Sequence, residues 1–134
     1  MTGETSLSLL LRNLSARLNP GDYVFCSLPD HSLPTGLVPL GSFREQEGPT
    51  VIVEQQDAQR LGLAFDYVAA WITLDVHSSL AAVGLTAAFS QALAEAGISC
   101  NVIAGYYHDH LFVARDDAER ALAALRQLAH PEGH

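Results

Sequence analysis

The chain has 134 residues, 49% of them hydrophobic, and a formal net charge of -8. This length and composition suit one compact domain, or two small ones packed over a shared core. All seven basic residues are arginines, so a nucleic-acid partner is not expected, because such binding relies on basic side chains that neutralise phosphates. No apolar run reaches the roughly 20 residues of a membrane-spanning helix. The amino terminus carries Glu4 where a signal peptide carries a base. We therefore expect a soluble, cytoplasmic protein with no membrane partner.

The first half of the chain alternates short regular elements with loops. Leucines at intervals of three and four residues predict an amphipathic helix over Ser6–Leu18, which Pro20 and Gly21 end. After it we expect a buried strand over Tyr23–Leu28, an irregular loop over Pro29–Pro39, a hairpin with arms Gly41–Gln46 and Thr50–Glu54, and a helical turn over Asp57–Leu61 that Asp57 caps.

The second half predicts a β-α-β-β-α order. The expected elements are a long strand over Tyr67–Val76, a helix over Leu80–Ala96 that Gly97 ends, strands over Ile98–Ala104 and Leu111–Ala114, and a helix over Asp116–Leu128. With both helices on one side of an antiparallel sheet, this order is the split βαβ, or ferredoxin-like, arrangement. The fourth strand of such a unit is missing after Leu128, so the first half or another subunit must supply an edge strand.

Both cysteines lie in apolar, β-prone segments. Cys26 stands in "YVFCSL" and Cys100 in "ISCNVI", and neither belongs to a CxxC motif. We expect both to be buried, reduced packing residues, because a free cysteine behaves as a small hydrophobic side chain.

The second half resembles the ACT domain family, small regulatory modules best known for binding amino acids. The resemblance rests on "VGLTAAFSQALAEAGISCNVIAGYYHDHLFVARDDAERALAAL", residues Val83–Leu125. It includes a helix start that contains glycine, "LAEAGI" leading into a strand, a hairpin, and a last helix that begins with acids. The first half, through "LGSFREQEGPTVIV" (Leu40–Val53), is similar to a bacterial group of small tandem ACT-like proteins of largely undefined function.

The resemblance implies an α+β fold of two ferredoxin-like (ACT, βαββαβ-type) subdomains, with antiparallel sheets and helices on one face. We place an irregular, partial amino-terminal subdomain at residues 1–64 and a carboxyl-terminal ACT domain at residues 65–134. The family further implies a homodimer and a small ligand held at an interface between ACT units.

The segment "YYHDHLFV" (Tyr106–Val113) raises the question of chemistry, because two histidines flank an aspartate. In the split βαβ order, the strands that begin at Tyr67 and Leu111 are antiparallel neighbours. The carboxyl end of the first therefore lies near the amino end of the second. This predicts a rim that brings Asp75 and the residues after it close to Tyr107–His110, with the start of the next helix nearby.

Such a rim suits a zwitterion such as an amino acid. Free N–H groups and the dipole at a helix start favour a carboxylate, serine hydroxyls add donors, and aspartates favour an ammonium group. The predicted ligand-binding residues are His77, Ser78, Ser79, Leu80, Gly84, Tyr107, Asp109 and His110.

A metal is the alternative chemistry at this rim. Imidazole nitrogens and carboxylates bind zinc and similar ions, so His77, His108 and His110 could serve, with Asp109. No HxxxH or HExxH spacing on a helix fixes a third ligand, and we predict no metal site.

Each candidate also has a purely structural interpretation. Asp109 suits a hairpin turn, because aspartate tolerates left-handed backbone geometry and bonds its own backbone. Ser78 and Ser79 suit a helix cap. His110 suits a partly exposed strand start. Gly84 inside a helix would cost about 1 kcal/mol relative to alanine, so close approach of a ligand or of another backbone would explain it.

No nucleophile elbow, phosphate-binding glycine loop or dinucleotide fingerprint occurs in the chain. We therefore predict a non-catalytic regulatory or sensor protein that binds a small molecule, an amino acid, without a cofactor. The first alternative is a structural or protein-interaction module whose rim is empty. The second alternative is a metal-binding protein or an enzyme.

Overall fold

The computed structural model describes residues 7–30, 32–75 and 84–130. They form two compact units. Unit 1 contains the described residues of 1–19 and 71–134, and unit 2 contains those of 20–70. Helices and antiparallel strands occur in both, so the α+β class with ferredoxin-like units is confirmed.

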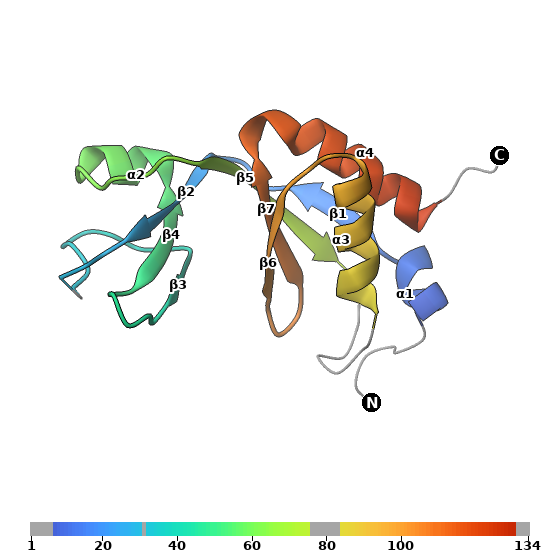
Figure 1. The fold of residues 1–134 in the computed structure, drawn as a ribbon, viewed down its shortest axis with the longest axis horizontal. Coiled ribbons are helices and arrows are strands. Elements are labelled where there is room, and N and C mark those ends of the chain that lie inside the picture. Colours follow the sequence, from blue (N-terminus) through green and yellow to red (C-terminus); the bar gives the residue numbers. More distant parts are fainter. Residues whose placement is uncertain (1–6, 31, 76–83, 131–134) are drawn as a thin grey trace. The chain divides into compact units, whose positions relative to one another are not determined.

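Unit 1 has four strands with two helices packed against them, and a third, shorter helix packs on those two helices (Figure 1). The strand order is β1-β5-β7-β6. The strands are β1 (Ser15–Leu18), β5 (Val68–Asp75), β6 (Cys100–Ala104) and β7 (Asp109–Ala114), and the helices are α1 (Leu7–Arg12), α3 (Leu85–Glu95) and α4 (Ala118–Ala129), the last preceded by a 3-10 turn at Arg115–Asp117. Helix α3 packs against α4 and β6, and α4 packs against β1 and β7.

The fourth strand of unit 1 comes from the amino-terminal part of the chain. β1 pairs antiparallel with β5, from Ser15 opposite Asp75 to Leu18 opposite Ile72. Of the two sources expected for the missing edge strand, the first half of the chain therefore supplies it.

The predicted helix over Ser6–Leu18 is wrong in its second part. The helix ends at Arg12, and β1 follows from Ser15. Leu14 and Leu18 fit a helical period of 3.6 residues, but with Ala16 they also fit the two-residue period of a strand. Pairing with β5, which is distant in the sequence, decides between the two.

The core of unit 1 lies between one face of the sheet and the helices. The fully buried side chains Phe89 and Leu93 of α3 and Leu125 of α4 share it with Leu74 and Leu111 of the strands. These apolar residues stand at every second strand position and at helical spacing on α3 and α4, which is why the second half forms its helices and strands in the predicted order.

Unit 2 has the strand order β3-β4-β2-β5. Its strands are β2 (Tyr23–Ser27), β3 (Gly41–Phe43), β4 (Thr50–Glu54) and the start of β5, and its helix is α2 (Gln55–Arg60). The predicted hairpin is confirmed, with Gly41 opposite Ile52 and Phe43 opposite Thr50. The predicted Pro29–Pro39 loop contains no helix or strand among its described residues.

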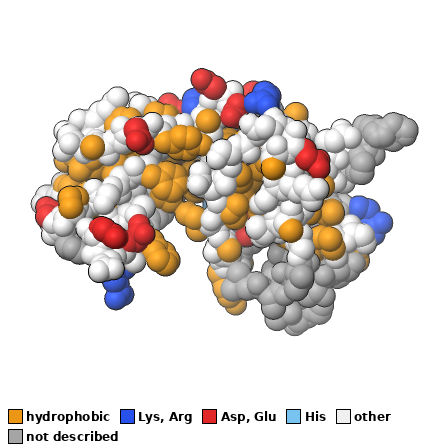
Figure 2. Space-filling view, viewed as in Figure 1, with side chains coloured by type: hydrophobic (Ala, Val, Ile, Leu, Met, Phe, Trp, Pro, Cys, Tyr) orange, Lys and Arg blue, Asp and Glu red, His pale blue; other side chains and the backbone are white. Residues whose placement is uncertain are grey.

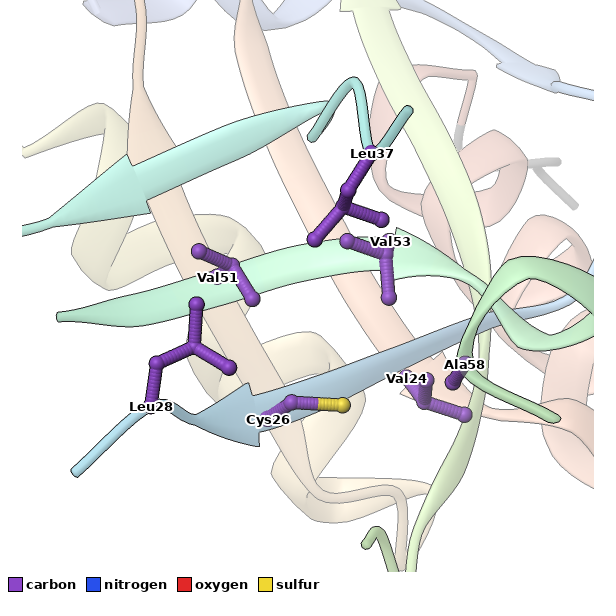
Figure 3. Packing of buried hydrophobic residues seen from close by; sticks show 7 residues of the cluster. All are labelled: Val24, Cys26, Leu28, Leu37, Val51, Val53 and Ala58. Carbon is purple, nitrogen blue, oxygen red and sulfur yellow. The ribbon is translucent and has the colours of Figure 1, made fainter. Parts of the chain in front are cut away.

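Unit 2 contains an apolar cluster of buried side chains. Figure 3 shows its members gathered from β2, β4, α2 and the loop that follows β2. The cluster consists of Val24, Cys26, Leu28, Leu37, Val51, Val53 and Ala58. Cys26 is buried in this cluster, so it is the packing residue that the sequence predicted, and its burial raises the pKa of the thiol.

Strand β5 takes part in both units. Val68 and Ala69 pair with β2 in unit 2, whereas Ile72–Asp75 pair with β1 in unit 1. In chain order, β5 is thus the last strand of unit 2 and the strand that opens the β-α-β-β-α run of unit 1. Both units then have the same sheet order, in which the first strand lies between the fourth and the third.

Two predicted helix starts need correction. Helix α2 begins at Gln55, so Asp57 lies in its first turn and forms an ion pair with Arg60 instead of capping it. Helix α3 is described from Leu85, and Gly84 before it has a left-handed backbone (φ 98°) that a helix cannot include; the predicted start at Leu80 lies outside the described residues. Gly84 is therefore the residue before the helix and not a glycine inside it.

Candidate functional site

A network of polar side chains covers one face of the unit 1 sheet. It is formed by alternate residues of neighbouring strands: Arg17 and Asn19 at and after β1, Trp71, Thr73 and Asp75 on β5, and His108 and His110 at the start of β7. Side chains two positions apart on a strand point to the same face, which brings these residues together. Their neighbours Ile72, Leu74, Leu111 and Val113 point to the opposite face and are fully buried.

Asp75 is the charged centre of this network. Nε of Arg17 lies 2.8 Å from its Oδ2, and Nη2 lies 3.3 Å from its Oδ1. Nδ1 of His108 lies 3.2 Å from the same Oδ1, at ion-pair distance but without hydrogen-bond geometry. The Arg17 hydrogen bond holds the pKa of Asp75 below its ordinary value. Asp75 is therefore a carboxylate at neutral pH, and it lies between the guanidinium of Arg17 and the imidazole of His108.

His110 lies in the half-buried part of the network. The indole Nε1 of Trp71 donates a hydrogen bond to Nδ1 of His110 at 3.1 Å, and Thr73 Oγ1 lies 3.4 Å from the same nitrogen. Asn19 Nδ2 donates to Thr73 Oγ1 at 2.8 Å. Burial lowers the pKa of His110, with the nearby His108 acting in the same direction.

The structure brings together part of the predicted rim. Asp75 meets His108, as the split βαβ order predicted, and His110 lies on the same face. His77, Ser78, Ser79 and Leu80 lie outside the described residues. Ligand binding by the eight predicted residues stays a prediction.

Asp109 lies on the other face of the sheet from His110. It is the first residue of β7 and pairs with Ala104, so it is a strand residue and not the hairpin-turn residue that the sequence suggested. Burial raises its pKa, and His110 opposes that shift. The turn comprises residues 105–108, where Tyr107 is 76% exposed and its ring meets that of Tyr106 edge to face.

Gly84 is the N-cap residue of α3 and has no side chain that could cap the helix. Only glycine readily adopts its left-handed φ of 98°. A Cβ atom at this position would also lie 3.3 Å from Cδ2 of Leu7. Both facts give a structural reason for this glycine.

Within the described residues, no three side chains of the His, Cys, Asp and Glu types come together as a metal ion would require. Burial raises the pKa of the Cys100 thiol to about 11, and the side chain is half-buried. Neither the metal alternative nor a cysteine nucleophile gains support from these residues.

The sequence interpretation missed four members of the network: Arg17, Asn19, Trp71 and Thr73. The alternation in "WITLD" was a usable signal, because Trp71, Thr73 and Asp75 must share a strand face. The sequence could not assign Arg17 and Asn19 to this face, because a helix was predicted for the segment that forms β1.

Two family comparisons cover nearly the whole chain. One ACT domain model matches residues 2–70, and another matches residues 67–127. The chain belongs to the ACT domain family. The first match includes the segment of β1, which the fold places in unit 1, so consecutive ACT sequences fold here into units that interleave along the chain.

Solved structures of other proteins resemble this ACT domain chain. A protein of unknown function from Vibrio cholerae, described as a possible transport protein, is 50% identical, with 93% of this chain and 97% of that chain covered and a TM-score of 0.83. The ligand-free regulatory subunit of aspartate kinase from Thermus thermophilus is 13% identical, with 84% and 95% covered and a TM-score of 0.63. The second likeness concerns the fold alone.

A search of curated proteins found no matching sequence. No helix in the described part of the chain has the length and apolar content that crossing a bilayer requires. Figure 2 shows few basic side chains on the face that it draws, in keeping with the seven arginines of the sequence. Membership of the ACT family supports a regulatory, amino-acid-binding role in general terms.

Proposed function

We propose that this chain is a non-catalytic regulatory protein that binds a free amino acid through unit 1. The observation that carries the proposal is the ACT domain match to residues 67–127, because this segment contains every predicted ligand-binding residue. Among the described residues these are Gly84, Tyr107, Asp109 and His110. The other four, His77, Ser78, Ser79 and Leu80, precede Gly84 in the chain.

The start of α3 supplies the group for the ligand carboxylate. This helix has 11 residues, and its N-cap residue is Gly84, which has no side chain to cap it. The first N–H groups of a helix and the positive end of its dipole favour a carboxylate. Gly84 has no side chain that would cover these N–H groups.

Asp109 supplies the group for the ligand ammonium. Burial raises the pKa of its carboxyl group, and a bound ammonium would lower it again, because an opposite charge favours the ionised form. Ligand affinity should therefore fall as the pH drops through the pKa of Asp109. His110 points to the other sheet face, so we assign it no direct contact with the ligand.

A thermal-shift screen of the twenty amino acids at millimolar concentration tests the proposal. At least one should raise the melting temperature, because a ligand that binds only the folded state stabilises it by RT ln(1 + [L]/Kd). Asp109→Asn should lose this shift. Asp66→Asn, at an exposed position of unit 2, should keep it. No shift with any amino acid would contradict the proposal.

We also propose that two copies of the chain associate along β6. This strand is the last in the sheet order, and its residues "CNVIA" carry no charge and no proline. Ile103 is 41% exposed. An edge strand of this kind offers unpaired backbone groups to another strand. Light scattering after gel filtration should give a dimer, and Ile103→Lys a monomer; a monomeric wild-type chain would contradict this.

A further inference from the structure

The chain has one tryptophan, Trp71, and its indole forms a hydrogen bond with His110. Nε1 of Trp71 lies 3.1 Å from Nδ1 of His110, and the two ring centroids are 5.8 Å apart. The indole ring also stacks on Phe112, with an interplanar angle of 12°. These contacts join β5 to β7 on the polar face of the unit 1 sheet.

The chemistry of this hydrogen bond fixes the proton on His110. Indole Nε1–H can only donate, so Nδ1 must accept, and the proton of the neutral imidazole is on Nε2. The Nε2 side of the ring faces the hairpin, since a Cβ atom on Gly105 would lie 3.3 Å from Nε2. A doubly protonated His110 would place two N–H donors against each other at Nδ1.

Thr73 offers the alternative partner for that nitrogen. Its hydroxyl oxygen lies 3.4 Å from Nδ1 of His110 and is held by a hydrogen bond from Asn19. A hydroxyl oxygen has two lone pairs, so it can accept from Asn19 and from an imidazolium at once. Thr73 is 1% exposed, so this acceptor is shielded from water.

The charged groups around His110 come from three elements. Arg17 on β1 and His108 before β7 oppose its protonation, whereas Asp109 on β7 and Asp75 on β5 favour it. On β6, its pairing partner is the apolar Ile103. Burial outweighs the two carboxylates, so the pKa of His110 stays below its ordinary value and the ring is neutral at pH 7.

We propose that His110 is a proton-operated switch that exchanges Trp71 for Thr73. When Nδ1 takes up a proton, the Trp71–His110 hydrogen bond breaks and Nδ1–H donates to Oγ1 of Thr73. The indole then loses its hydrogen bond to His110 on β7, whereas its stacking on Phe112 remains. This switch is a property of unit 1 beyond amino-acid binding and does not depend on it.

The indole N–H signal in a ¹H–¹⁵N NMR spectrum tests the switch directly, because a single tryptophan gives a single signal. Between pH 8 and pH 5 this signal should move, with a midpoint below the ordinary histidine value of about 6.5. His110→Gln should abolish the titration, because the glutamine amide oxygen accepts from Trp71 and does not titrate in this range.

The matched control is His108→Gln. It removes a neighbouring imidazole that opposes protonation of His110, so the indole signal should still titrate, with its midpoint moved to higher pH. An indole signal that stays in place from pH 8 to pH 5 would overturn the proposal. So would a titration that persists in His110→Gln, or one that occurs only together with loss of backbone amide dispersion, which would report unfolding.

Discussion

Unit 1 and unit 2 share a strand order but differ in what covers their sheets. In unit 1, α3 and α4 lie against one sheet face, and the other face carries the network of Arg17, Asp75 and His110. In unit 2, the six-residue α2 and the loop after β2 enclose a purely apolar cluster. The same topology therefore supports a polar, titratable surface in one unit and simple packing in the other.

We expect the largest effect from deleting the amino-terminal segment, which tests whether unit 1 needs the strand that it takes from the start of the chain. Deleting residues 1–19 removes β1 and the buried Leu10 and Leu14, and exposes the edge of β5. Unit 1 should lose its cooperative fold. Hydrogen exchange read by mass spectrometry should show lost protection in α4 and β7, while β2 and β4 keep theirs. Unchanged protection of α4 and β7 would show that unit 1 does not need its amino-terminal strand.

The core of unit 1 should depend on Phe89, which is fully buried in α3. Phe89→Ala should lower the free energy of unfolding of unit 1 by about 3–5 kcal/mol, because it removes buried apolar surface and leaves a cavity. Denaturant unfolding with a probe in each unit measures this loss. Leu33→Ala, at a position that is 50% exposed, is the control and should change little. Equal losses in the two variants would contradict the assigned core.

The hairpin of unit 2 should depend on Gly48. Its φ is 129°, and a Cβ atom there would overlap the carbonyl oxygen of Leu28 and lie 3.1 Å from Cα of Pro29. Gly48→Ala should therefore destabilise unit 2 by more than about 2 kcal/mol. Urea unfolding followed by circular dichroism would detect it. A variant as stable as the parent chain would mean that the β3–β4 turn is not held against Leu28.

The smallest expected effect concerns the polar face of unit 1. The pKa of Asp75 is lowered in the folded state, chiefly by Arg17, so its stabilising effect is present above the ordinary carboxyl pKa of about 3.9 and is lost as the pH falls through the lowered value. Asp75→Asn should remove this contribution, which is less than about 1 kcal/mol because the pair is exposed. Acid unfolding of the parent chain and of Asp75→Asn measures this difference. Identical midpoints of acid unfolding would contradict a stabilising effect of the Arg17–Asp75 pair.

The sequence predicted the elements whose apolar pattern is local. β2, β4, β5 and α4 lie within two residues of their expected positions, because buried β-branched runs and helical leucine spacing leave one interpretation. The sequence prediction was wrong for β1, where pairing with the distant strand β5 favours a strand over a helix. It was also wrong for Gly84, whose left-handed backbone cannot be part of a helix.

The candidate site was predictable in part. The predicted strand order alone placed Asp75 beside His108, since antiparallel neighbours bring those strand ends together. It could not show that Asp109 and His110 diverge, because this depends on β7 starting at Asp109 and not at Leu111. It also assigned no chemistry to Trp71, whose partner His110 lies 39 residues away in the chain.

The most direct test of amino-acid binding by unit 1 is an NMR titration of the ¹⁵N-labelled chain with an equimolar mixture of the twenty amino acids. The proposal predicts saturable shifts at Gly84, Tyr107 and Asp109, and unchanged signals for the unit 2 cluster around Val24 and Val53. No shifts at millimolar concentration, or shifts confined to unit 2, would contradict it.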